Sequence, residues 1–97
     1  MSENLKNIEG MKSDLENFTS IFNQALKIYK DRYPEFAAMW RRFPIQDLYL
    51  YSMIKMRRSM EFYNQGNKVK AMEDYLDALN ILLFVGAMLS KDDKKTR

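Results

Sequence analysis

The chain contains no cysteine and no histidine in its 97 residues. The first absence excludes disulfide bridges, thiolate nucleophiles and cysteine metal sites. The second removes the side chain that most often acts as an acid–base catalyst near neutral pH and as a metal ligand. The three glycines are isolated at positions 10, 66 and 86, so no glycine-rich phosphate-binding loop exists. These absences predict a protein that is not an enzyme and that carries no catalytic residue, metal or cofactor.

Long apolar runs are missing as well. The longest, residues 81–89, is far shorter than the roughly 20 residues that a helix needs to cross a bilayer. The first residues, Met-Ser-Glu-Asn, do not show the basic and then apolar stretch of a secretory signal. We therefore expect a cytoplasmic protein that makes no contact with membranes. The length suits a single domain.

A four-residue break, Asn-Gln-Gly-Asn at residues 64–67, separates two long helical patterns. Gly66 accepts the left-handed conformation that ends a helix, and Asn67 is a good N-cap for the next one. Apolar residues at helical spacing run over 45–63 before the break and over 72–83 after it. The pattern predicts a tight hairpin of two antiparallel helices.

A third helical pattern precedes the hairpin and has steps that alternate between three and four residues, as in packed helices. Gly10 weakens the helix locally, so we expect either a kink there or a frayed segment over residues 1–12. Pro34 ends this helix and Pro44 begins the next, which leaves about two turns of short helix between them. The apolar positions of the stripe are Ile8, Met11, Leu15, Phe18, Phe22, Ala25 and Tyr29.

These elements predict an all-α fold, an antiparallel three-helix bundle with one short connecting helix. The bundle would form a single domain over residues 1–90, and the charged residues 91–97 would form a disordered tail. Three carboxylates near the start of the last helix, Glu73, Asp74 and Asp77, are interpreted as a solvated face rather than a cation site.

The net charge is +3, and most of the excess lies in the middle of the chain beside aromatic residues. Basic and aromatic side chains together suit a nucleic-acid backbone and its unstacked bases. They suit an acidic protein surface equally well, and a third interpretation is a solvated helix face with Trp40 closing the end of the bundle. The candidate nucleic-acid-binding residues are Arg41, Arg42, Lys55, Arg57 and Arg58.

Methionines at helical spacing and an all-apolar segment add a second candidate surface. Met fills irregular cores and also adapts to varied partners, so both uses stay open for Met53, Met56 and Met60. Residues 81–89 are apolar on every side, and a partner chain would help to cover them. The candidate partner-binding residues are Trp40, Arg41, Arg42, Phe43, Met53, Met60, Phe84 and Met88.

The hairpin resembles a single tetratricopeptide-type helical pair, in which small residues let two helices approach closely. The matching positions are Ser59, Phe62, Gly66, Ala71, Tyr75 and Ala78. The three-helix layout is also similar to a family of small archaeal domains of unknown function, whose final hairpin has the same Gly-Ala-Ala spacing. The resemblance implies a fold and an intracellular setting, and it implies no activity.

Our leading hypothesis from the sequence is a non-enzymatic accessory subunit that docks on a larger protein. Its partner would belong to nucleic-acid machinery, such as an archaeal DNA polymerase holoenzyme, because a mildly basic subunit can sit beside DNA without repelling it. The alternatives are a direct DNA- or RNA-binding protein that uses the basic–aromatic patch and a homodimeric structural protein.

Overall fold

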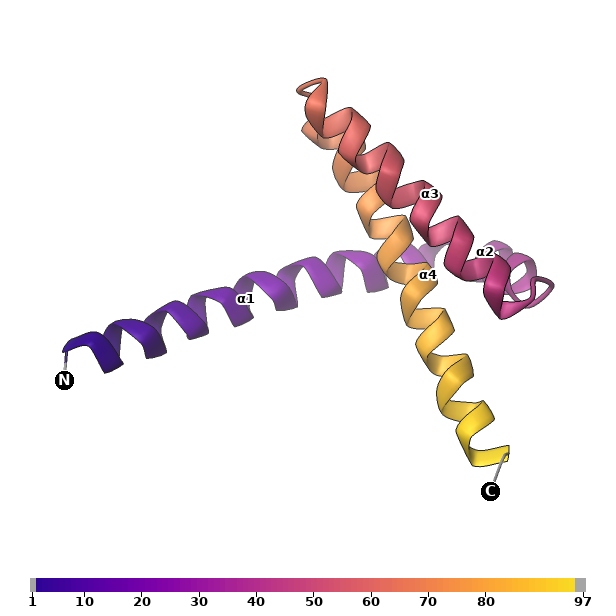
Figure 1. Cartoon of the computed structure of the whole chain (residues 1–97), viewed down its shortest axis with the longest axis horizontal. Coiled ribbons are helices and arrows are strands. Elements are labelled where there is room, and N and C mark those ends of the chain that lie inside the picture. Colours follow the sequence, from indigo (N-terminus) through magenta and orange to yellow (C-terminus); the bar gives the residue numbers. More distant parts are fainter. Residues whose placement is uncertain (1, 96–97) are drawn as a thin grey trace.

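In a computed structural model that describes residues 2–95, the chain folds into four helices, and this part of the chain contains no strand (Figure 1). The side chains of residues 2, 37 and 92–95 are not described. The prediction of an all-α fold with one short connecting helix is confirmed. The helices are α1 (Ser2–Asp31), α2 (Tyr33–Trp40), α3 (Ile45–Asn64) and α4 (Lys68–Lys95).

The predicted hairpin of α3 and α4 is confirmed, and its turn is closed by backbone hydrogen bonds. The N–H of Asn67 donates to the carbonyl of Phe62 at 2.9 Å, and the N–H of Gly66 donates to the carbonyl of Tyr63 at 3.0 Å. This pair of bonds defines a Schellman motif, which needs a left-handed residue. Gly66 supplies it with a φ of 78°. The side chain of Asn67 then accepts a bond from the N–H of Lys70 at 3.2 Å and caps α4.

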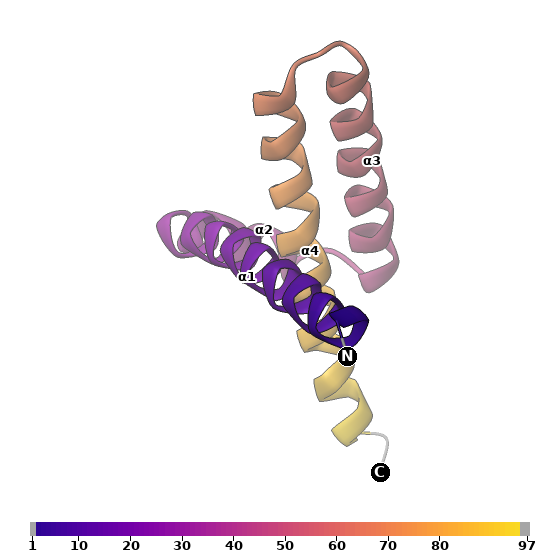
Figure 2. The ribbon, with the colours of Figure 1, turned by 90° about the vertical axis from the view of Figure 1, so that its left-hand side faces the viewer.

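Small residues hold the two helices of the hairpin together. Ala71 and Ala78 are buried between them, and the hydroxyl of Ser59 donates to the carbonyl of Ala71 at 2.6 Å. Figure 2 shows α3 and α4 lying side by side over the length of α3, with α4 continuing beyond it. The packing follows the small-residue spacing that the sequence suggested.

The hydrophobic core lies at the end of the hairpin opposite its turn. Helix α2 stacks Phe36 on Trp40 with ring centroids 4.7 Å apart, and the edge of Phe84 meets Trp40 at 5.5 Å. Tyr29 from the end of α1 closes the aromatic cluster, 5.9 Å from Trp40. The buried core residues are Phe36, Trp40, Leu48, Ile81 and Val85.

Helix α1 crosses α4 at one buried point instead of lying along the whole hairpin. Ala25 is fully buried there, and the side-chain amide of Asn80 donates to its carbonyl at 2.9 Å. Beyond the crossing, the N-terminal half of α1 points away from the hairpin (Figure 1). The radius of gyration is 16.7 Å, against about 13 Å for a compact domain of 100 residues.

Two details of the predicted bundle differ in the structure. Helix α1 runs without interruption through Gly10, where the sequence suggested a kink or a frayed start. Helix α4 continues through Lys95 into the predicted disordered tail, of which residues 96 and 97 lie outside the described part. Lysines at a helix C-terminus suit its negative end, which is consistent with this extension.

Candidate protein interface

The chain exposes far more surface than a compact monomer of its size. Its accessible area is 7766 Å². A folded monomer of 11.6 kDa exposes about 5,800 Å², so the surplus is about 1,900 Å². Much of it is apolar, because large hydrophobic side chains are exposed on α1, α3 and α4. Two separate apolar surfaces account for most of these residues.

The first surface is the outer face of α3, which we define as Tyr49, Leu50, Met53 and Ile54. All four side chains are between 43 and 58% exposed. The opposite face of α3 packs on α4 through Leu48, Ser52 and Ser59. A helix that buries one face normally presents polar residues on the other. The hairpin itself therefore does not account for four large apolar residues in little more than one turn of the exposed face.

Exposed basic and aromatic residues lie next to the outer face of α3 in the chain. The turn over residues 41–44 leads directly into α3, and in it Arg41, Arg42 and Phe43 are all exposed. Arg57 lies one turn beyond Met53 on the same helix and is also exposed. The structure thus leaves Arg41, Arg42, Phe43 and Met53 exposed, and their role in partner binding stays a prediction.

Trp40 belongs to the core and is not a surface anchor. Its side chain is 1% exposed and is packed between Phe36, Tyr29 and Phe84. The prediction that Trp40 binds a partner is therefore wrong, and the interpretation that it closes the end of the helical assembly is correct. The chain breaks between α1 and α2 at Arg32, and the apolar face of α2 then packs on α4 through Trp40 and Phe84.

The predicted nucleic-acid patch is largely engaged in ion pairs within the chain. The ammonium group of Lys55 lies 3.3 Å from Asp77 and 3.8 Å from Asp74. Arg58 lies 3.5 Å from Asp74, and Arg57 lies 3.9 Å from the exposed Glu61 one turn along the same helix. Arg41 and Arg42 remain exposed and make no ion pair with other described residues. Three of the five candidate residues are therefore engaged in ion pairs within the chain.

The carboxylates in these ion pairs are not all solvated, although the sequence analysis interpreted them as a solvated face. Asp74 is only 5% exposed and Asp77 is half-buried, so two of the three predicted solvated carboxylates face α3. Glu73 is exposed as expected. Asp74 and Asp77 turn inward because they fall on the same face of α4 as Ala71 and Ala78, the face that packs on α3. A carboxylate needs a cation when buried. Lys55 and Arg58 supply it for Asp74, and Lys55 supplies it for Asp77.

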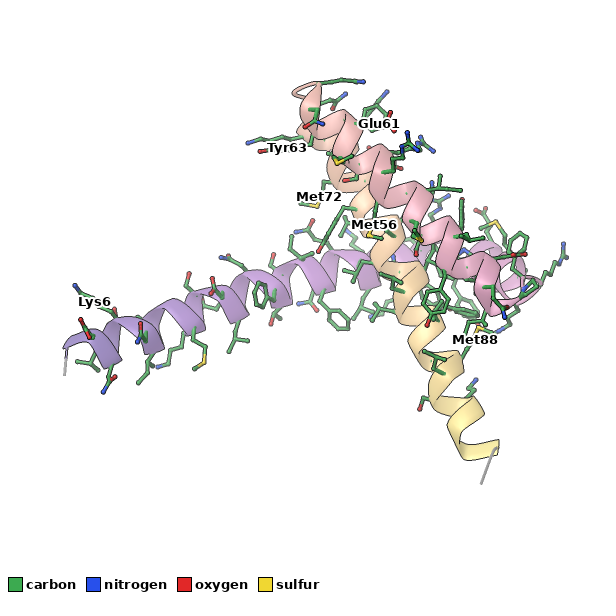
Figure 3. All side chains as sticks on the ribbon, viewed as in Figure 1. Lys6, Met56, Glu61, Tyr63, Met72 and Met88 are labelled. Carbon is green, nitrogen blue, oxygen red and sulfur yellow. The ribbon has the colours of Figure 1, made fainter. Side chains whose placement is uncertain are left out.

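The second surface is a notch where the N-terminal half of α1 leaves the hairpin. The notch has a volume of about 740 Å³. In Figure 3, Tyr63 and Met72 project from the hairpin on the side that faces α1, and Met56 lies on the same side. Its lining comes from three helices and consists mostly of methionine and aromatic side chains: Asn17, Phe18, Ile21, Met56, Ser59, Met60, Tyr63, Lys68, Ala71, Met72 and Tyr75.

One wall of the notch continues into an exposed ridge on α1. The ridge contains the N-terminal positions of the three-and-four stripe, each more than 40% exposed: Ile8, Met11, Leu15, Phe18 and Phe22. The sequence placed these residues inside a bundle, whereas the structure leaves them uncovered. Their exposure could not be read from the pattern, because a heptad stripe looks the same whether its partner is in the same chain or in another.

The remaining predicted partner-binding residues fall in different places. Met60 lines the notch and Met53 lies on the outer face of α3. Phe84 and Met88 are half-buried beside Arg41 in a cavity of about 300 Å³ near the core. Sequence reasoning missed Tyr49, Leu50 and Ile54 on the outer face of α3. Their signal was present, since all three lie outside the stripe by which α3 packs on α4.

Comparison of the chain with protein-family models, with curated proteins and with solved structures yields no match. Over residues 2–95, no helix combines the length and the apolar character required for a membrane span. The resemblances that the sequence suggested therefore stay predictions.

Proposed function

We propose that this chain is a non-enzymatic protein-interaction subunit that docks on a larger protein through the outer face of α3. The observation that carries the proposal is the exposure of Tyr49, Leu50, Met53 and Ile54 on a helix whose other face is already buried. Exposed apolar patches of this kind on folded proteins are typical of interaction sites. Burial of these four side chains against a partner would remove that apolar area from water.

The charges around the outer face of α3 favour an acidic rim on the partner. Arg41 and Arg42 precede the face and Arg57 follows it, and all three are exposed. Arginine and aromatic residues are enriched at the centres of protein interfaces, and Phe43 adds an exposed aromatic ring. The mild net charge of +3 also suits a partner that works on nucleic acid, such as the polymerase assembly suggested by the sequence.

A matched pair of variants on α3 tests the proposal. Ile54 and Met60 are 56 and 57% exposed, and they lie on the outer face and in the notch respectively. We expect proteins captured from the native host by the wild type to be retained by Met60→Glu and lost by Ile54→Glu. Circular dichroism checks that both variants remain helical. Retention of the same proteins by both variants would contradict the assignment to the outer face of α3.

A further inference from the structure

We propose that the notch and the α1 ridge bind a second copy of this chain, so that two chains form a two-fold dimer in which each ridge fills the notch of the other. The proposal concerns a different surface from the outer face of α3. One chain presents both a protruding apolar helix and an apolar recess, and Phe18 belongs to both. In a two-fold dimer, the ridge of each chain would lie in the notch of the other, so the same contact would form twice and cover both surfaces.

The chain has enough surplus surface to contribute to a stable dimer. The surplus of about 1,900 Å² over a compact monomer belongs to the whole chain and is shared between the outer face of α3 and the notch with its ridge. The smallest obligate homodimers bury about 1,000 Å² per subunit, which is about half of that surplus. An interface of standard size buries about 800 Å² per partner. The ridge also repeats the packed-helix spacing over five positions, Ile8 to Phe22, which is the pattern that a helix uses to pack along another helix.

Charge complementarity between the ridge and the notch supports a second copy as the occupant. Over residues 3–16, the helix that bears the ridge carries four acidic and two basic side chains, a net charge of −2. The charged residue in the lining of the notch is basic: it is Lys68, the first residue of α4. Lys70 follows in the same turn, and that turn has no acidic residue. Two basic residues beside the positive end of a helix are unfavourable in an isolated chain. An acidic helix from the second copy would offset them.

A second copy in the notch would also cover the part of the hairpin near its turn, which α1 and α2 of the same chain leave open. At the core end, α1 and α2 cover the hairpin through Tyr29, Phe36 and Trp40. Near the turn, Met60, Met72 and Tyr75 line the notch without such a cover. The N-terminal half of a second α1 would complete the hairpin there. Methionines suit this role because they adapt to the partner's surface.

Light scattering on the purified chain tests the proposal without any other protein present. We expect twice the chain mass of 11.6 kDa at micromolar concentrations. Met60→Glu and Phe18→Glu should each raise the dimer dissociation constant by at least about tenfold, because a carboxylate would be buried in an apolar contact. Ile54→Glu, on the same helix as Met60 but outside the notch, should leave the dimer intact. All three residues are exposed, so helicity measured by circular dichroism should stay unchanged.

Three outcomes would overturn the proposal: a single-chain mass at high micromolar concentration, a dimer that survives both notch variants, or equal loss with Ile54→Glu. A single-chain mass would leave docking through the outer face of α3 untouched, because that function is tested by host proteins and a different variant.

The absence of cysteine allows a second measurement. Leu15→Cys on a tagged chain, mixed with Met60→Cys, should form a disulfide between the two chains, and the Leu15→Cys and Ile54→Cys mixture should not. Equal cross-linking in both mixtures would reject the notch as the binding site.

Discussion

The two halves of helix α1 carry the same apolar pattern and have opposite environments. In the C-terminal half, Ala25 is fully buried against α4 and Tyr29 packs on Trp40. In the N-terminal half, Leu15 and Phe18 continue the stripe with more than half of each side chain exposed. The difference arises at the crossing, where a small residue on α1 meets Asn80 and directs the helix away from the hairpin. A periodic stripe therefore predicts that a face will be covered, and the tertiary fold decides which chain can cover it.

The largest expected effect is at the covered end of the molecule. Trp40→Ala should lower the free energy of unfolding by about 3–5 kcal/mol, because it empties a buried aromatic site. Phe43→Ala, three residues away and exposed, should change it by less than about 0.5 kcal/mol. Urea denaturation followed by circular dichroism measures both values. A loss below 1 kcal/mol for Trp40→Ala would mean that the aromatic cluster does not hold α2 on the hairpin.

Covered and uncovered positions can also be compared for charged residues, with Lys55 and Arg57 of α3. The side chain of Lys55 is 15% exposed and pairs with Asp74, whose side chain is 8% exposed. Lys55→Ala should cost about 1–3 kcal/mol, since it removes the buried cation that pairs with Asp74 and Asp77 and leaves the more exposed Arg58 beside Asp74. Arg57→Ala removes an exposed pair with Glu61 and should cost less than about 0.5 kcal/mol. Equal losses in urea denaturation would show that burial does not distinguish the two pairs.

The Lys55→Ala variant also tests nucleic-acid binding, in a salt titration of DNA affinity. If Lys55, Arg57 and Arg58 contacted DNA phosphates, the logarithm of the binding constant would fall with the logarithm of salt concentration by about 0.9 per contact. The observed ion pairs occupy Lys55 and Arg58 within the chain. We therefore expect at most the contributions of Arg41, Arg42 and Arg57 to such a slope. A slope that falls when Lys55 is replaced by alanine would contradict this expectation.

Local features of the fold were predictable from the sequence, and long-range features were not. Gly66 and Asn67 located the hairpin because their backbone and side-chain bonds involve neighbours within five residues. The two prolines located the breaks only approximately: Pro34 is the second residue of α2, whose first residue is Tyr33, and Pro44 is the N-cap of α3. The burial of Trp40 and Asp74 depends on helices far away in the sequence. The basic residues beside Trp40 therefore did not reveal its burial, and the position of Asp74 near the start of a helix did not reveal its burial either. The course of α1 depends on contacts that are distant in the sequence, such as the hydrogen bond between Asn80 and Ala25, residues 55 positions apart, and the packing of Tyr29 on Trp40.

That crossing gives a prediction of intermediate size. Asn80→Ala removes the bond to the carbonyl of Ala25 and should cost about 0.5–1.5 kcal/mol. Because the contact also fixes α1 on α4, the amides of the C-terminal half of α1 should exchange their hydrogens faster in the variant. Hydrogen exchange followed by mass spectrometry measures this rate along α1. Unchanged exchange in α1 would show that packing alone, without this bond, holds the crossing.

The smallest expected effect is in the uncovered half, and its size should depend on assembly. In the Met60→Glu background, which we expect to be a single chain, Leu15→Ala should change the free energy of unfolding by less than about 0.5 kcal/mol, because the side chain is 52% exposed. In the wild-type background, the same substitution should lower the melting temperature, and the loss should grow with protein concentration, since dimer formation stabilises only the folded chain. Tyr29 occupies the equivalent position of the stripe two heptads after Leu15, in the covered half of α1. Tyr29→Ala should lower the melting temperature in both backgrounds by an amount that does not depend on protein concentration. If Leu15→Ala has the same small effect in both backgrounds at every concentration, the ridge has no partner in a second copy. Differential scanning calorimetry over a series of concentrations separates these outcomes.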